Sequence, residues 1–277
     1  MAPTIEKEIK QMHKELEHMI HAQLPELIKI LSKELSLPFS NGILRKSGLP
    51  PPQQINLNFE LSENPSIKGN IVVSSSNVEQ MDLIAQMNVF NRKHLFQIFL
   101  TNGVKYRLQQ LNLAEIYMLK LMDLIDSSIN FSQFHDTIKF VDGVINKLKQ
   151  ILDQFKYPRN QFLFPEYYCD PKIITPELPN DLIIQYYIVE GDVMIELIHF
   201  KRITESSSSS GFSLANTLKR SNTPPSFYQN QPVEILEKLT IKVNHPKLSQ
   251  LYSKLKSILE DWTKFNENLY IFDDESF

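Results

Sequence analysis

A repeated apolar seam over residues 246–272 restricts the folds open to this chain more than any other feature of its sequence. His245 and Pro246 open the segment, and proline is tolerated in the first turn of a helix because its missing N–H would have no helical partner there. Apolar residues then recur at alternating intervals of three and four, the period that keeps one face of a helix against a partner helix. They are Leu248, Leu251, Leu255, Ile258, Trp262, Phe265, Leu269 and Phe272. The segment therefore predicts a long helix that packs lengthwise against another helix.

Three other segments, residues 4–36, 107–129 and 134–156, carry seams of the same kind. The seam of the first shifts near Pro25, which should kink or break that helix because proline lacks an N–H and its ring collides with the preceding turn. Pro158 ends the last. The apolar positions are Ile5, Ile9, Met12, Leu16, Met19, Ile20, Leu24, Leu27, Leu31 and Leu35; then Leu111, Ala114, Met118, Leu121 and Ile125; then Phe134, Ile138, Val141, Ile145, Leu148, Leu152 and Phe155.

The four seams predict an antiparallel four-helix bundle packed at coiled-coil angles. Its helices would come from residues 4–36, 107–156 and 246–272, so the helical domain would be discontinuous and the remaining chain would be inserted into it. We interpret the seams as the core of that bundle. The alternative is a seam left open for a helix of another protein.

Between the helices the apolar period changes to two, which is typical of half-buried strands. An antiparallel β domain is therefore expected over residues 53–100 and 160–243. Because neighbouring strands occur in runs apart from the helices, the predicted fold class is α+β. The expected strands are 55–61, 67–73, 81–89, 94–100, 182–189, 193–203 and 233–243.

Residues 204–232 differ in composition from the rest of the chain. Their Ser206–Ser210 run and their prolines offer too little apolar area to offset the entropy of ordering the chain. The segment is predicted to be a flexible Ser/Pro-rich loop within the β domain. Ser221 and Thr223 are candidate phosphorylation sites, although short motifs of this kind also arise by chance.

Composition and charge exclude several classes of protein. The formal net charge of −3 argues against a nucleic-acid-binding surface, which is normally basic. A single cysteine, Cys169, fits a reducing compartment. No signal peptide or membrane span is apparent, so we expect a cytoplasmic protein that reaches membranes only through partners. The seven glycines form neither of the standard phosphate-binding loops.

No arrangement of residues indicates catalysis, and we expect no catalytic, cofactor-binding or metal-binding residues. A di-iron bundle needs Glu-x-x-His on two helices. Glu15 and His18 match once, but Glu196 and His199 lie on an expected strand, where positions i and i+3 face opposite sides. Cys169 has no adjacent basic group to lower its pKa. An enzyme of unrecognised type remains an alternative.

The order of elements around residues 164–203 resembles the Rogdi family, which includes the smaller subunit of the yeast RAVE complex. Phe164-Pro165-Glu166 is followed by Leu178-Pro179-Asn180-Asp181-Leu182-Ile183, which leads directly into the hairpin of residues 182–203. A loop, one more strand and the terminal heptad helix come next. The leucine-rich first helix and Tyr106-Arg107-Leu108-Gln109-Gln110, which leads into a helix, are also similar, so the resemblance covers residues 5–272.

The resemblance implies a helical-bundle domain, a sheet domain and a role in assembling the vacuolar proton-pumping ATPase (V-ATPase). The implied partners are a large WD-repeat RAVE or DMX-like subunit and subunits of the ATPase's peripheral sector. The implied location is cytoplasmic, with recruitment to vacuolar or endosomal membranes. The resemblance brings no catalytic residues with it.

Two tyrosines are candidates for partner binding, because exposed aromatic side chains favour interfaces. Tyr186 and Tyr187 lie on the expected strand 182–189, and the alternative for both is burial in the core. Another function class also stays open, in which the 248–272 seam pairs two copies of the chain into a homodimeric trafficking or tethering adaptor.

Overall fold

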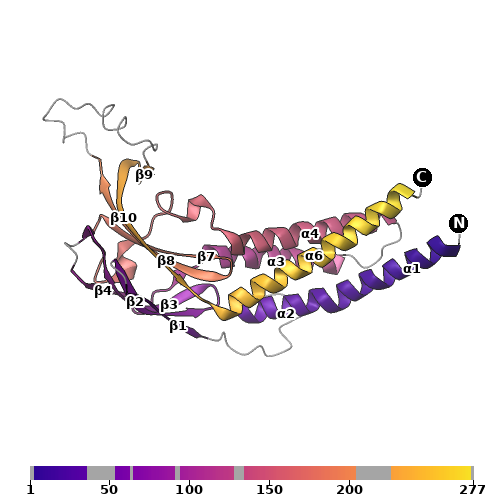
Figure 1. Cartoon of the computed structure of the whole chain (residues 1–277), viewed down its shortest axis with the longest axis horizontal. Helices are drawn as coiled ribbons and strands as arrows, with labels where there is room; N and C mark the ends of the chain where they lie inside the picture. Colours follow the sequence, from indigo (N-terminus) through magenta and orange to yellow (C-terminus); the bar gives the residue numbers. More distant parts are fainter. Residues whose placement is uncertain are drawn as a thin grey trace, which may run out of the picture. The chain divides into compact units, whose positions relative to one another are not determined.

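The computed structural model describes residues 3–35, 54–62, 65–90, 94–127, 134–203 and 226–275. The chain divides into two compact units (Figure 1). The helical unit comprises Met1–Gln53, Gln110–Lys156 and Pro246–Phe277, and the sheet unit comprises Gln54–Gln109 and Tyr157–His245. None of the helices in the described ranges is long and apolar enough to cross a membrane.

The last helix, α6 (Pro246–Glu275), confirms the helix predicted from the heptad seam. The seam residues from Leu248 to Leu269 are all buried, and Trp262 is completely enclosed. They face α4 (Phe134–Lys156), whose own predicted seam is also buried from Ile138 to Phe155. The Trp262 and Phe140 rings meet edge to face, with their centroids 6.3 Å apart.

The N-terminal segment is not one regular helix. It consists of α1 (Pro3–His18), a π-helical turn η1 (Met19–Gln23) and α2 (Leu24–Leu35). The backbone N–H of Leu24 donates to the carbonyl of Met19, five residues back. Because Pro25 has no N–H to offer the preceding turn, the break predicted from the sequence takes the form of a π turn directly before it.

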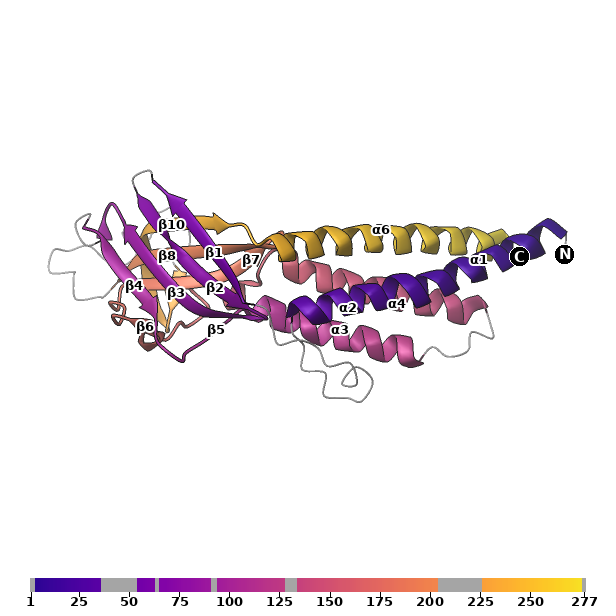
Figure 2. The same cartoon turned by 90° about the horizontal axis from the view of Figure 1, so that it is seen from below.

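The predicted antiparallel four-helix bundle is wrong, although the α+β class is right. The helices α4 and α6 lie side by side (Figure 2), and α2 meets α6 over a shorter stretch. Among the described residues, no other pair of helices distant in sequence approaches as closely. Heptad periodicity shows that a helix has an apolar face but not how many helices share one core. The third helix, α3 (Gln109–Ser127), also carries exposed apolar residues, Ile116 and Leu119, outside its seam.

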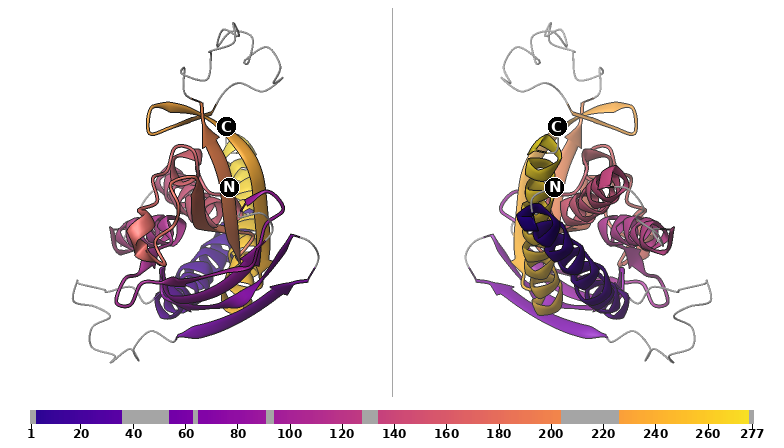
Figure 3. Two further views of the ribbon diagram at one scale, coloured as in Figure 1. Left: turned by 90° about the vertical axis from the view of Figure 1, so that its left-hand side faces the viewer. Right: turned by 90° about the vertical axis from the view of Figure 1, so that its right-hand side faces the viewer.

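The sheet unit contains two antiparallel sheets instead of one inserted layer. Sheet A has the order β1-β2-β3-β4-β6, with β5 paired to β3, and sheet B has the order β7-β8-β10-β9. The strands of the two sheets run in different directions (Figures 2 and 3). Their bounds are β1 Ile55–Leu61, β2 Ser66–Ser74, β3 Asn77–Gln86, β4 Phe96–Leu100, β5 Tyr106–Arg107, β6 Ile174–Thr175, β7 Leu182–Val189, β8 Asp192–Arg202, β9 Ser226–Tyr228 and β10 Gln231–Val243.

A carboxylate on sheet B holds the turn that follows β3 of sheet A. Glu237 lies where β10 shifts its register against β8. Its two oxygens accept hydrogen bonds from the backbone N–H groups of Asn88, Val89 and Phe90. Three amide donors that no strand partner satisfies thus meet one anion, which ties the two sheets together at this end.

Part of the predicted flexible loop 204–232 is ordered sheet structure. Residues 204–225 lie outside the described residues, but β9 and the start of β10 form a tight hairpin within 226–232. Its two turn residues, Gln229 and Asn230, have φ angles of 51° and 61°. Two positive φ angles are typical of a type I′ turn, whose usual sequence signal is Asn-Gly or Asp-Gly. Gln-Asn lacks that glycine, so the hairpin was missed.

Candidate partner-binding surface

The turn Leu178–Leu182 connects the loops after the helical segment to the first strand of sheet B. Leu178 and Leu182 are buried and act as anchors, while Pro179, Asn180 and Asp181 between them are exposed. The backbone N–H of Leu182 donates to the Pro179 carbonyl at 3.0 Å, and that of Phe200 donates to the Asp181 carbonyl at 2.9 Å. The turn is therefore fixed to the start of β7 and the end of β8, and it presents its polar residues outward.

A narrow hollow of about 70 Å³ is lined in part by residues of this turn. Its walls combine apolar and aromatic side chains with polar ones, and Arg202 is one of the polar residues that line it. The residues that line it are Tyr168, Cys169, Pro171, Leu178, Pro179, Asn180, Leu182, Ile183, Arg202, Tyr228 and Gln229.

A wide hollow of about 560 Å³ also borders the turn and shares Asn180 and Arg202 with the narrow one. It is lined by Asn180, Asp181, His199, Phe200, Lys201, Arg202 and Leu236. His199 Nε2 lies 3.5 Å from an Asp181 carboxylate oxygen. The other ring nitrogen, Nδ1, is buried and has no hydrogen-bond partner among the described residues.

Arg202 is held in place by neutral groups. Its guanidinium donates to Gln231 Oε1 at 2.7 Å and to Gln229 Oε1 at 3.0 Å, and it lies 5.8 Å from the centre of the Tyr228 ring. In the described part of the chain it forms no ion pair with a carboxylate. The guanidinium is thus oriented, stacked on an aromatic ring and still able to pair with an anion.

An aromatic cluster adjoins the narrow hollow through Tyr228, which lines it. The rings of Phe164, Phe200 and Tyr228 contact one another with centroid distances of 5.1–5.3 Å. Tyr168 stacks on Tyr228 at 6.4 Å and is about half exposed. Burial raises the pKa of Tyr228 to about 12, so its hydroxyl stays protonated at neutral pH. Such packed aromatic side chains make the walls of the hollow stiff.

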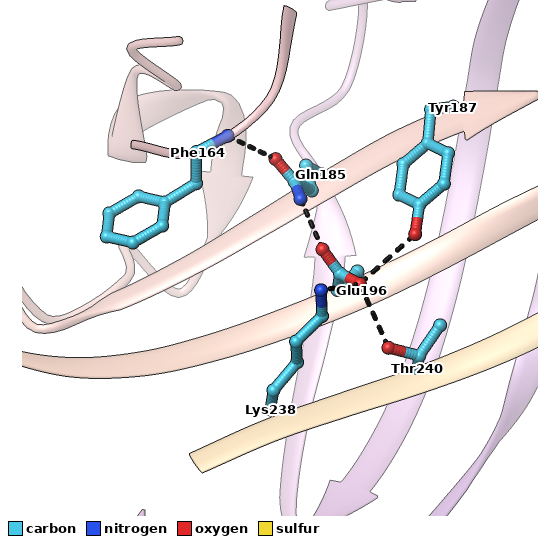
Figure 4. Close-up of polar contacts among 6 residues, drawn as sticks. All are labelled: Phe164, Gln185, Tyr187, Glu196, Lys238 and Thr240. Atoms are coloured by element: carbon cyan, nitrogen blue, oxygen red, sulfur yellow. Dashed lines mark hydrogen bonds and ion pairs between the residues drawn. The ribbon is translucent and has the colours of Figure 1, made fainter. Parts of the chain in front are cut away.

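A buried polar network lies next to this cluster in sheet B (Figure 4). Glu196 on the central strand β8 is 2% exposed and lies opposite Gln185 of β7 and Thr240 of β10. Its carboxylate accepts hydrogen bonds from Gln185 Nε2, from the Tyr187 hydroxyl at 3.1 Å and from the Thr240 hydroxyl at 3.0 Å. The Lys238 ammonium lies 2.7 Å away. The buried carboxylate thus has four nearby donors, three on Oε1 and one, Gln185, on Oε2.

The network reaches the backbone of the loop that carries the cluster. Gln185 uses its amide nitrogen on Glu196 and accepts from the backbone N–H of Phe164 at 2.8 Å with its oxygen. This donor–acceptor chain fixes the orientation of the amide and the position of Phe164. The network therefore supports the walls of the narrow hollow and does not itself line it.

The two tyrosines predicted to bind a partner occupy different environments. Tyr186 is 4% exposed, packs edge to face on Tyr106 and donates its hydroxyl hydrogen to the Met81 sulfur, so it lies in the core between the sheets. Tyr187 is half-buried, and burial followed by the Glu196 charge raises the pKa of its hydroxyl. A partner-binding role for Tyr187 stays a prediction. Ser221 and Thr223 lie outside the described residues.

The residues that line the two hollows had only partial signals in the sequence. The Leu178–Leu182 segment was singled out for its resemblance to a family, but Arg202, Tyr168 and Tyr228 were not. Arg202 and Tyr228 are brought together by the register of β8 with β10 and of β10 with β9, and the second pairing is made across the missed Gln229-Asn230 turn, whereas Tyr168 comes from the segment before β6. No His, Cys, Asp or Glu cluster in the described ranges has three members placed to hold a metal ion.

Cys169 lines the narrow hollow but should be chemically inert. It is 5% exposed, and burial, followed by the nearby Asp170 charge, raises the pKa of its thiol to about 12. At pH 8 the thiolate, which is the reactive form, would then amount to roughly one part in 10⁴, against about a quarter for an ordinary cysteine. We expect iodoacetamide to modify the native protein about a thousandfold more slowly than the urea-unfolded chain.

Mass spectrometry reads this prediction at a single site, because the chain has one cysteine. The urea-unfolded protein is the control for reagent quality. Equal rates of alkylation in the folded and unfolded chains would show that the thiol is open and ionised, and that the hollow is not walled as described.

Comparison with known proteins finds sequence similarity over most of the chain. The sequence model of the family described as Rogdi leucine zipper containing protein matches residues 15–223. The zebrafish (Danio rerio) protein named "Protein rogdi homolog" is 24% identical to this chain over 189 residues, which are 66% of this chain and 63% of the zebrafish protein. The similarity therefore spans less than two thirds of that relative's length.

Proposed function

The chain belongs to the Rogdi leucine-zipper family, and from this premise we propose that it is a non-enzymatic subunit of a RAVE/DMX-like complex. In this proposal the complex promotes assembly of the vacuolar proton-pumping ATPase from its soluble and membrane sectors. The chain contributes binding surfaces and no chemistry of its own. Its partners are the large WD-repeat subunit and subunits of the ATPase's peripheral sector, and it is cytoplasmic and recruited to vacuolar or endosomal membranes through them.

One observation carries the proposal: the family match runs through both compact units and includes the turn that borders both hollows. The surface there fits a protein-binding role. The narrow hollow, at about 70 Å³, is smaller than typical cofactor or metabolite pockets of roughly 300–1,000 Å³, whereas the wide hollow, at about 560 Å³, lies within that range, so size argues against a small-molecule ligand only in the narrow one. Tyrosine and arginine side chains around a small apolar depression are common where proteins meet.

The homodimer alternative has less support from the fold. Within one chain, the residues of the seam from Leu248 to Leu269 are already buried, and α6 lies along α4. A second copy would have to displace α4 to use the same face.

The test is an affinity purification of the tagged full-length chain from its own cells in mild detergent, with mass spectrometry of the bound proteins. We expect a giant WD-repeat protein together with peripheral-sector ATPase subunits, both absent from a tag-only control. In cells lacking the chain, less of the peripheral sector should sediment with membranes, and the wild-type chain should restore it. Recovery of neither partner by an intact, abundant bait, with normal sedimentation in the deletion, would overturn the proposal.

A further inference from the structure

We propose that the narrow hollow and Arg202 together bind a short segment of a partner protein in which an aliphatic side chain lies next to an aspartate or glutamate. The aliphatic group would enter the hollow, and the carboxylate would pair with the Arg202 guanidinium. The inference rests on the proposed function only in that the chain works by binding proteins. It does not require that the partner belong to the ATPase or its assembly complex.

The size of the narrow hollow selects a single side chain. At about 70 Å³ it has roughly half the volume of a cavity that accommodates benzene, about 150 Å³. Its walls of Leu178, Leu182, Ile183 and the tyrosine rings match an aliphatic group such as the end of a valine or leucine. A free inorganic anion would leave the apolar part of this space empty, and a nucleotide would not fit into it.

The charge around the turn selects an acidic neighbour for that side chain. Lys201 and Arg202 both border the wide hollow, and His199, which also lines it, lies beside the Asp181 carboxylate. The Asp181 carboxylate faces His199, which leaves Arg202 without an acidic partner among the described residues. A planar guanidinium in this state favours a carboxylate, to which it can donate two parallel hydrogen bonds.

The site is organised before any partner arrives. Gln229 and Gln231 hold the guanidinium from the hairpin side, and the Tyr228 ring supports its face. Other parts of the wall come from Pro179 and the buried anchors Leu178 and Leu182, and Phe164 packs on Tyr228 from behind the hollow's lining. Because these groups already occupy defined positions, little side-chain entropy remains to be lost on binding.

Exposed apolar residues beside the hollows offer further contacts to the rest of a bound peptide. Leu236 borders the wide hollow and is 39% exposed, and Ile235 next to it is 46% exposed. Both lie at the register shift of β10, where the strand turns side chains outward. A peptide that fills the narrow hollow and crosses the turn would reach them.

The test selects peptides from a phage-displayed library of random dodecapeptides on the purified full-length chain. We expect an enriched pattern in which Val, Leu or Ile lies within two positions of Asp or Glu. A synthetic peptide from the selection is then measured by fluorescence anisotropy. Arg202→Gln should weaken its binding about 10- to 100-fold, because an oriented charge pair at a binding pocket is lost.

Three controls accompany this measurement. Lys68→Gln on β2 of the other sheet makes the same change in net charge away from the turn, and it should leave affinity within about twofold. Tyr168→Ala removes a half-exposed wall of the narrow hollow together with its stacking on Tyr228 and should weaken binding several-fold. The peptide with its acid changed to the amide should lose as much affinity as Arg202→Gln. Thermal melting by circular dichroism verifies that each variant is folded.

Several outcomes would overturn the inference: no enriched pattern, an enriched pattern without an acid, or equal binding by wild type and a folded Arg202→Gln variant. Competition by millimolar inorganic phosphate as effective as that by the peptide would make this a simple anion site. Arg202-dependent self-association in light scattering would instead make the occupant a second copy. A successful selection combined with failure to recover ATPase subunits would remove the proposed function and leave this inference standing.

Discussion

Trp262→Ala should lower the free energy of unfolding of the helical unit by about 3–5 kcal/mol, as for other large aromatic residues removed from a core. Trp262 is fully buried in the seam of α6 and meets Phe140 of α4 edge to face. Truncation removes its burial and that ring contact, and it leaves a cavity that the α4–α6 pair can close only in part. Urea unfolding followed by far-UV circular dichroism measures the loss. Fluorescence cannot serve, because this is the chain's one tryptophan.

Two control substitutions test whether the loss of stability in Trp262→Ala comes from the burial of the side chain. Trp262→Phe keeps an aromatic ring in the seam and should cost less than half as much, since the indole Nε1 has no hydrogen-bond partner among the described residues. Tyr270→Ala on the same helix removes an exposed ring and its hydrogen bond to Asp142, and it should cost about 1 kcal/mol or less. Similar losses for Trp262→Ala and Tyr270→Ala would refute the tight packing of α6.

Glu196→Ala should destabilise the sheet unit by about 2–4 kcal/mol, chiefly because it leaves buried donors without an acceptor. The amide of Gln185, itself 2% exposed, would lose its partner, and so would the hydroxyl of Tyr187. The Lys238 ion pair contributes little to this loss, because the lysine side chain is 51% exposed and would be solvated without Glu196.

Substituting each partner of the Glu196–Lys238 ion pair in turn, and measuring stability by the same urea unfolding, tests whether the hydrogen bonds or the ion pair stabilise the network. Lys238→Ala should cost less than about 1 kcal/mol, because it removes only the solvated partner. Glu196→Gln should fall between the two, since it keeps the shape and one acceptor oxygen but turns a second amide toward Gln185. If Lys238→Ala and Glu196→Ala cost the same, the ion pair and not the buried hydrogen bonds would hold the network.

The sequence was sufficient for most individual elements, because their apolar periods are long and regular. The buried positions of α4 and α6 follow the predicted seams, and β1, β2, β7 and β8 begin and end close to the predicted positions. Shorter elements were missed: the two-residue strands β5 and β6 carry no measurable period. The strand β9 was hidden in a serine- and proline-rich stretch.

How the elements assemble was less predictable than the elements themselves. The apolar seam of α3 was identified, but a seam does not indicate which helices pack against it. The four-helix bundle inferred from the four seams was therefore wrong. The division of the strands into two sheets also lies outside local periodicity, because a half-buried strand has the same pattern in either sheet.

The candidate partner-binding surface could likewise be predicted only in part, because its residues come from separate places in the sequence. Leu178–Leu182 was noticed as a segment, whereas its neighbours Tyr168, Arg202 and Tyr228 come from three other places in the sequence. Glu196 was considered only as a weak metal ligand and dismissed, yet it organises the polar core of sheet B. A buried acid in a strand has no sequence signal that distinguishes it from an exposed one.

The origin of the helical unit from three separated stretches has a consequence for synthesis on the ribosome. The sheet unit ends at His245, so all of its strands have been translated before α6 begins, and it can fold while translation continues. About a hundred more residues must be translated after α4 before α6 is available to cover the apolar face of α4. At roughly 5–20 residues per second, that face stays uncovered for about 5–20 s in each new chain. During this interval it would be open to chaperones, so a stop codon within 246–275 should yield chains with a persistent chaperone-binding helix.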